Sequence, residues 1–83
     1  MYYTYILEST STGRLYIGQT KDLYDRIDRH NRNLNKSTKN QGPWKLLYNT
    51  IFETRSEAVT LERKLKGFKN PKKVKEWISR SVD

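Results

Sequence analysis

LYIGQTKDLYDRIDRH, residues 15 to 30, predicts the central part of the fold, because it passes from a strand through a polar turn into a helix. Tyr16 lies on the predicted strand. Arg26 and His30 lie on the predicted helix, spaced i, i+4 and therefore on one helical face. His30 falls beside Leu23, at the edge of the apolar stripe. A basic pair next to a core-facing stripe indicates a candidate site; the alternative is a pair of ordinary solvated side chains.

The residues before this stretch predict a hairpin. Residues 2 to 8 are rich in tyrosine and aliphatic side chains, and a cluster of turn formers follows at residues 9 to 13. A four-residue loop, 9 to 12, places Tyr5 directly opposite Tyr16, with both side chains on one face of the hairpin. The two tyrosines either line a cleft or form an aromatic pair that only packs, and the sequence leaves both possibilities open.

A helix and a polar loop follow the hairpin. Asp22 is suited to cap the helix, which we expect to run to about Asn33. Residues 33 to 42, NLNKSTKNQG, contain almost no apolar side chains and predict a loop. Lys36 and Lys39 in this loop, with the hydroxyl and amide groups around them, can donate to phosphates, although most loops of this composition are simply solvated.

The second half of the chain predicts one strand and two helices. Trp44 to Phe52 forms the strand, and its aliphatic residues on both faces indicate that it is covered on both sides. The two expected faces are Leu46, Tyr48 and Phe52, and Leu47 and Ile51. Thr54-Arg55-Ser56-Glu57 is a capping box that opens a long helix, and Asn70-Pro71 begins another. The predicted order of elements is therefore β-β-α-β-α-α, an α+β chain.

Glu62 is the acidic residue whose position needs an explanation. The long second helix has an apolar stripe that consists of Ala58, Leu61, Leu65 and Phe68. Glu62 falls between Ala58 and Leu65 on the helical wheel and so borders this stripe, where carboxylates are rare unless they are paired or bound to a metal. One interpretation is a salt bridge to Arg26 or a nearby lysine, and the other is a metal-binding or catalytic carboxylate. The residues alone do not decide between them.

Length and charge limit the possible functions. The 83 residues make one small domain, 1–83, with no room for a second core. The net charge is +8, so we expect a polyanion as partner, with nucleic acid the first candidate and an anionic membrane surface the second. Between Glu62 and the end of the sequence, eight basic residues outnumber three acidic ones, which places much of this charge in the C-terminal part.

Several classes of protein are excluded by what the composition lacks. The sequence has no cysteine and one histidine, which excludes disulfide frameworks, thiolate metal sites and multi-histidine zinc sites. It has no apolar run long enough to span a membrane and no signal peptide. We therefore expect a cytoplasmic protein with no membrane partner and no obligate protein partner.

Five features, in order and spacing, carry a resemblance to a known family. They are Tyr3-Thr4-Tyr5, Tyr16-Ile17-Gly18, Arg26, His30 and Glu62. This series resembles the GIY-YIG nuclease superfamily, and especially its small single-domain bacterial members. The resemblance covers nearly the whole chain, from Tyr2 to about Lys69, and implies a three-stranded antiparallel sheet flanked by helices.

The resemblance also implies an activity, which is cleavage of a phosphodiester bond with one divalent metal ion, Mg²⁺ or Mn²⁺. By position, Tyr5 and Tyr16 match the tyrosines of the two half-motifs. Arg26 matches the arginine that contacts the scissile phosphate, and His30 matches a histidine found in some members. Glu62 matches the metal-binding glutamate.

The sequence departs from the family pattern at two places. Tyr3 stands where the first half-motif usually has glycine. Many members carry an asparagine about three turns after the glutamate, but that place falls near Val74 here, and the nearest asparagine is Asn70. The chain has no appended DNA-recognition domain, so we expect little sequence specificity.

The residues suit this chemistry. Glu62 can hold a Mg²⁺ ion, whose remaining ligands would be water and the nucleic-acid phosphate. Arg26 can stabilise the charge of the transition state. A tyrosine can act as general base only if a nearby cation lowers its pKa; His30 or Arg26 could supply that charge, or His30 could relay the proton. The expected phosphate-binding lysines are Lys21, Lys36, Lys39, Lys66 and Lys69.

The sequence therefore predicts a metal-dependent endonuclease that acts on DNA or structured nucleic acid. The alternative is a nucleic-acid-binding module on the same fold with weak or no catalysis, and the net charge supports both equally. A third possibility, a structural or partner-binding domain, requires the basic surface to be incidental. Glu62 separates the first two, because a pure binding module has no need of an acid where a phosphate binds.

Overall fold

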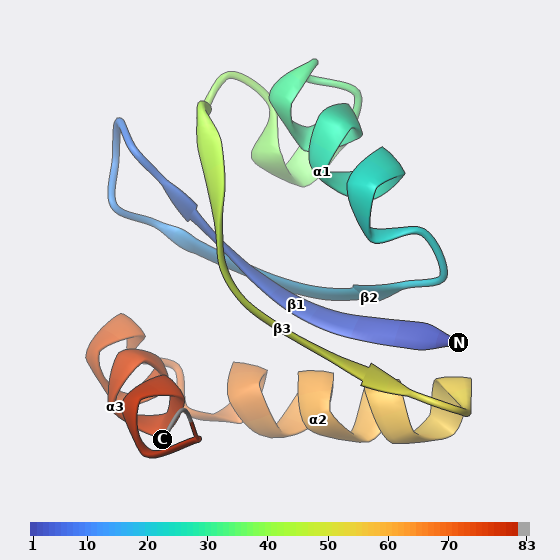
Figure 1. Cartoon of the computed structure of the whole chain (residues 1–83). Helices are drawn as coiled ribbons and strands as arrows, with labels where there is room; N and C mark the ends of the chain where they lie inside the picture. Colours follow the sequence, from blue (N-terminus) through green and yellow to red (C-terminus); the bar gives the residue numbers. More distant parts are fainter. Residues whose placement is uncertain (82–83) are drawn as a thin grey trace.

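The computed structural model describes residues 1–81 and confirms the predicted order of elements. The elements are β1 (Tyr2–Ser9), β2 (Leu15–Thr20), α1 (Leu23–Asn31), a 3-10 turn η1 (Lys36–Thr38), β3 (Trp44–Phe52), α2 (Arg55–Gly67) and α3 (Pro71–Ser81). The strands form one three-stranded antiparallel sheet in the order β2-β1-β3. Helix α1 lies on one face of this sheet, and α2 and α3 lie on the other (Figure 1). No helix within residues 1–81 is long and apolar enough to cross a membrane.

The first helix begins and ends at polar side chains. Asp22 is its N-cap and accepts a hydrogen bond from the backbone N–H of Asp25 at 3.0 Å, as the sequence predicts. The helix ends at Asn31, slightly before the predicted Asn33, because Asn33 takes a left-handed conformation with φ of 62° that breaks the helical pattern.

The two later helices also begin at their predicted caps. Thr54 accepts a hydrogen bond from the backbone N–H of Glu57 and opens α2. The Asn70 side chain accepts one from the backbone N–H of Lys72 at 2.9 Å, and Pro71 occupies the first turn of α3. Local sequence therefore determines where all three helices start.

The hairpin register differs from the prediction. Tyr5 lies opposite Gly18 and not opposite Tyr16. The turn begins one residue later than predicted, because Ser9 still belongs to β1 and its N–H donates to the carbonyl of Arg14 at 2.9 Å. Moving the turn by one residue shifts the register by two, which keeps every side chain on its predicted face. The two tyrosines still share a face and meet diagonally.

The sheet separates two hydrophobic clusters. The cluster beneath α1 consists of Tyr5, Leu7, Leu23 and Trp44. The cluster beneath α2 and α3 consists of Ile6, Ile17, Leu65 and Val74. Because successive residues of a strand point to opposite faces, β1 contributes alternately to both clusters. Its central position in the sheet buries it from both sides.

The prediction that β3 is covered on both sides is confirmed only in part, because α1 and α2 both contact this strand but two of its aliphatic residues stay exposed. Leu46 and Ile51 are 39% and 47% exposed. Leu47 and Tyr48 both pack against the cluster beneath α2 and α3, although the sequence places them on opposite faces. The cause is a β-bulge, since β3 carries one extra residue opposite the middle of β1 and the alternation of faces changes there.

Candidate active site

Two tyrosines and the histidine gather on the sheet face beneath α1. Tyr5 comes from β1, Tyr16 from β2 and His30 from α1. The centroids of the Tyr5 and Tyr16 rings lie 6.1 Å apart, and those of Tyr16 and His30 lie 4.6 Å apart. Tyr5 and His30 are completely buried, whereas Tyr16 is partly exposed. Of the three, Tyr16 is therefore the one that solvent can reach.

A chain of hydrogen bonds fixes the buried members of this group. The Tyr5 hydroxyl lies 3.1 Å from His30 Nε2, and His30 Nδ1 lies 2.7 Å from the hydroxyl of Thr38. Thr38 in turn donates to the carbonyl of Asn35 at 3.4 Å. Its oxygen then accepts from His30 Nδ1–H, which leaves Nε2 to accept the proton of Tyr5. In this arrangement Tyr5 is a donor and the imidazole is neutral.

Thr38 is a residue that sequence reasoning missed. It lies in the loop for which only solvated or phosphate-binding side chains were expected, yet it is 1% exposed. The 3-10 turn η1 brings it under His30, and its carbonyl accepts a hydrogen bond from the indole N–H of Trp44 at 3.4 Å. The usable signal was Trp44, because a tryptophan directly after a polar loop needs a partner for its N–H.

Gly18 makes room for both tyrosine rings. A Cβ atom at this position would lie 2.7 Å from the Tyr5 hydroxyl oxygen and 3.0 Å from Cε2 of Tyr16. Both distances are too short for a methyl group to fit without movement of a ring. The glycine of the second half-motif is therefore explained by the close approach of two aromatic side chains.

The electrostatics of the cluster favour neutral groups. Burial raises the pKa of Tyr5 well above its ordinary value, and the neighbouring Tyr16 adds to the rise. The positive charge of Arg26 acts in the opposite direction but is outweighed. Burial also lowers the pKa of His30 to about 4, helped by Arg26. His30 is therefore neutral at pH 7, and the expectation that it could supply a cation to a tyrosine is wrong.

Arg26 has a buried nitrogen without a partner. Its Nε is shielded from solvent, and no acceptor for it exists within the part of the chain that the structure describes. Its charge acts on both Tyr5 and His30, so the guanidinium lies beside the aromatic cluster. A buried donor without an acceptor is costly, and such a group in a folded protein calls for an explanation, of which a catalytic role is one.

Glu62 approaches the cluster from the other side of the sheet. It lies on α2, and its negative charge contributes to the raised pKa of Tyr5. Its carboxylate lies 2.7 Å from the ammonium group of Lys66, one turn later on the same helix. The salt bridge to a nearby lysine, one of the two interpretations of Glu62, is thus present. The Glu62 side chain is 18% exposed.

The donor set around Glu62 suits only some metals. Residues 1–81 contain no cluster of three or more histidine, cysteine, aspartate or glutamate side chains that could hold an ion. A structural zinc or calcium site is therefore not formed by these residues. Mg²⁺ needs less from the protein, since it keeps several waters and often takes one carboxylate together with substrate phosphates. Glu62 fits that requirement.

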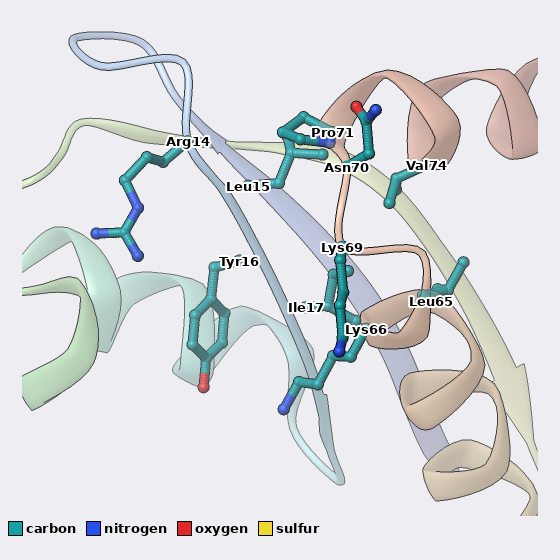
Figure 2. Close-up of a pocket in the computed structure, with 10 residues that line it drawn as sticks. All are labelled: Arg14, Leu15, Tyr16, Ile17, Leu65, Lys66, Lys69, Asn70, Pro71 and Val74. Carbon is teal, nitrogen blue, oxygen red and sulfur yellow. The ribbon is translucent and has the colours of Figure 1, made fainter.

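The five predicted phosphate-binding lysines do not lie together. Lys66 and Lys69 line a groove of about 340 Å³ between β2 and the junction of α2 with α3, and Tyr16 lines it too (Figure 2). Lys21 lies elsewhere, 5.7 Å from the centre of the Tyr2 ring. The other two, Lys36 and Lys39, are exposed on or next to the 3-10 turn η1.

The groove also has a cation that the sequence analysis did not single out. Arg14 lines it from the start of β2, and its guanidinium donates to the side-chain oxygen of Gln41 at 2.7 Å. This contact joins the hairpin turn to the loop before β3. Only the folded chain brings these two segments together, so no local pattern predicts the contact.

Comparison with known proteins identifies the family. A family model described as the GIY-YIG catalytic domain matches residues 1–75. The chain belongs to the GIY-YIG family. It is 40% identical over 75 residues to a UPF0213 protein of Staphylococcus saprophyticus, with 89% of this chain and 90% of that protein covered. A UPF0213 protein of Staphylococcus aureus is 37% identical over the same length and coverage.

A solved structure agrees with this assignment. The solution NMR structure of the UPF0213 protein BH0048 from Bacillus halodurans matches with a TM-score of 0.59 and 32% identity, over 95% of this chain and 84% of that one. Among GIY-YIG proteins, this chain departs from the common pattern at Val74. That side chain is 3% exposed and belongs to the cluster beneath α2 and α3, while Asn70 caps α3. Asn70 also lines the groove between β2 and the junction of α2 with α3.

Proposed function

We propose that this protein is a metal-dependent endonuclease that hydrolyses phosphodiester bonds in DNA or structured nucleic acid. The observation that carries the proposal is Arg26, whose buried Nε lacks an acceptor and whose charge acts on Tyr5 and His30. A phosphate oxygen would satisfy this donor. Removing one such contact from a dry site typically costs catalysis a factor of roughly 100–1,000.

Tyr16 is the proposed general base. It is partly exposed, and of Tyr5, Tyr16 and His30 it is the one that solvent, and therefore an attacking water molecule, can reach. Tyr5 is unsuited to this role because burial raises its pKa and its proton is directed to His30. We assign Tyr5 and His30 as positioning residues that hold the Tyr16 ring, with Thr38 fixing the imidazole.

Glu62 is the residue that would hold the metal ion, Mg²⁺ or Mn²⁺. When bound, such an ion supplies positive charge that stabilises the phosphate in the transition state and the departing oxygen. Glu62 is paired with Lys66 in the free protein, and its side chain is partly exposed. Arg14, Lys66 and Lys69 would bind the flanking phosphates.

The second candidate function is a nucleic-acid-binding module without catalysis. The Glu62–Lys66 salt bridge at 2.7 Å favours it, because it gives the carboxylate a structural partner and no metal is then required. Both functions share the basic groove. They differ in whether Glu62 is needed for cleavage.

The deciding experiment is cleavage of branched, nicked and linear DNA with Mg²⁺ or Mn²⁺ by the wild-type protein and Glu62→Gln. Gln keeps the shape of the side chain but not the charge that holds a divalent ion. We expect the variant to lose metal-dependent cleavage and to bind DNA as well as before or more tightly. Because Lys66 is 54% exposed, losing the salt bridge should change the free energy of unfolding by no more than about 0.5 kcal/mol.

Glu76→Gln is the matched control, since Glu76 is an exposed glutamate on α3 outside the groove. It should cleave like the wild type. Normal cleavage by Glu62→Gln would reject the metal-binding role. A wild-type protein that binds DNA and cleaves none of the substrates with either metal would favour the binding module.

A further inference from the structure

The groove beside Tyr16 combines an apolar interior with a basic rim. Its accessible apolar lining is Leu15 and Pro71, which lie over the buried core residues Ile17, Leu65 and Val74. Arg14, Lys66 and Lys69 also line it, and Figure 2 shows the Arg14 guanidinium directed away from the apolar side chains, on the side where Tyr16 lies. At about 340 Å³ it has the size of a small-ligand site and is far smaller than the groove that holds a duplex.

The apolar interior is not explained by binding to phosphates. Contacts to a phosphate backbone need only cations and hydrogen-bond donors, which the rim already supplies. A flat group with apolar faces that is attached to phosphates would use both parts of the groove. An unpaired nucleobase is such a group, because base stacking on apolar or aromatic side chains stabilises single-stranded nucleic acid in many binding sites.

The outer edge of β2 adds hydrogen-bonding groups to the groove. β2 is an edge strand, and within residues 1–81 no other strand pairs with its outer side. The N–H of Ser9 donates to the carbonyl of Arg14, so the backbone polar groups of Arg14 point toward β1. Along an antiparallel strand, the backbone N–H and C=O groups of successive residues point alternately toward and away from the paired strand. The backbone N–H and C=O groups of Leu15 and Ile17 therefore point away from β1, toward the groove that these residues line. These groups can form hydrogen bonds with the edge of a nucleobase.

The groove adjoins the proposed active site through Tyr16. This residue lines the groove between Leu15 and Ile17, and its ring packs on His30 on the α1 side of the sheet. A nucleotide held in the groove would thus lie next to the phosphate that Arg26 is proposed to contact. Its own phosphates would lie within reach of the three rim cations.

We propose that this groove binds one unpaired nucleotide adjacent to the scissile phosphate, with the base against Leu15 and Pro71 and its phosphates at the basic rim. The protein would then select nucleic acid with an end, flap or single-stranded junction over continuous duplex. This inference rests on the proposed function only for the position of the scissile phosphate; the binding of an unpaired base can be measured without catalysis.

The test compares two forms of one ligand. The first is a DNA duplex with a short single-stranded overhang, and the second has the same overhang with abasic nucleotides, which keeps every phosphate. Affinity is measured by fluorescence anisotropy in EDTA, so that cleavage plays no part. We expect the abasic form to bind about tenfold more weakly, a typical effect of losing a stacked base. Equal affinities for the two forms would overturn the proposal.

A variant pair locates the effect. Leu15→Gln removes an apolar contact in the groove and should lower the preference for the intact overhang to about twofold or less. Leu46→Gln is the control, because Leu46 is an exposed leucine on the opposite edge strand, and it should keep the full preference. If both variants keep it, the base does not bind in this groove.

A second measurement covers the case in which Leu15→Gln does not fold. A 2-aminopurine placed in the overhang reports on its own surroundings, and its fluorescence should change when the wild-type protein binds. The same probe inside the duplex should not respond, and equal responses at the two places would overturn the proposal. Failure of the proposed function gives a different result, namely no cleavage with Mg²⁺ or Mn²⁺ while the base preference remains.

Discussion

The two faces of the sheet differ in what they contain. The face beneath α1 holds aromatic rings joined by hydrogen bonds, a neutral buried histidine and an unsatisfied arginine nitrogen. The face beneath α2 and α3 is an aliphatic core that is closed at its margin by ion pairs of Glu8 with Lys45 and Lys75. Neighbouring residues of β1 thus have different roles. Tyr5 belongs to the proposed active site, and Ile6 belongs to the hydrophobic core.

This difference predicts which substitutions affect stability alone and which also affect activity. The aliphatic face can lose contacts at a cost in stability alone, whereas the face beneath α1 combines stability with the geometry of the site. Glu62 and Lys66 belong to the helix on the aliphatic face, yet they approach the site from that side. The proposed active site is therefore assembled at the β2 edge, where the two faces meet.

The largest expected effect on stability comes from the aliphatic face. Ile6 is completely buried beneath α2 and α3, so Ile6→Ala should lower the free energy of unfolding by about 2–5 kcal/mol. Denaturant titration measures this loss. At low temperature, the folded fraction should cleave and bind DNA as the wild type does. A variant that stays folded but loses cleavage would show that the two faces are not separable.

Gly18→Ala tests the other face. The added methyl group meets the Tyr5 hydroxyl, and overpacking of this kind typically costs about 1–3 kcal/mol. Because both tyrosine rings must move, we expect the cleavage rate of the folded variant to fall strongly, even where the loss in free energy of unfolding is small. Gly67→Ala is the control, since a Cβ there meets no atom within 4 Å. Full activity in Gly18→Ala would show that the placement of the rings is unimportant.

The smallest effect is a pH dependence caused by His30. Its pKa is about 4 when folded and 6.5 in the unfolded chain, so the unfolded state binds more protons between these values. Stability should therefore be constant above the unfolded pKa and should fall by about 1–2 kcal/mol as the pH drops from 7 toward 5. Thermal melts over this range measure it. His30→Gln should remove the slope, and a slope that persists in this variant assigns it to other groups.

Local signals in the sequence account for most of the fold. The caps Asp22, Thr54 and Asn70 start their helices as predicted, because a cap depends only on residues within one turn. The order of elements and the family followed from the spacing of the motif residues. The hairpin register did not, because the start of the turn is fixed by hydrogen bonds between segments, such as that from Ser9 N–H to the Arg14 carbonyl, which the composition of the turn does not reveal.

The candidate site was only partly predictable. The sequence predicts that Tyr5 and Tyr16 share one face of the sheet and that His30 lies at the edge of the apolar stripe of its helix. A shift of two residues in the hairpin register leaves the faces of the tyrosines unchanged. Thr38 was missed because it reaches His30 through the 3-10 turn η1, and Arg14 because its partner lies in a distant loop. The neutral state of His30 depends on complete burial, which a helical wheel does not reveal.

The central claim is that the face beneath α1 stabilises a transition state and does more than hold DNA. The most direct measurement is single-turnover cleavage together with the Kd for DNA, for Arg26→Ala and for the control Arg29→Ala, an exposed arginine on the same helix. If this face stabilises the transition state, Arg26→Ala should lower the cleavage rate by roughly 100–1,000-fold and leave Kd within a few-fold, while Arg29→Ala should change neither appreciably. A fall in affinity that accounts for the whole loss of cleavage would contradict it, because Arg26 would then only bind the substrate.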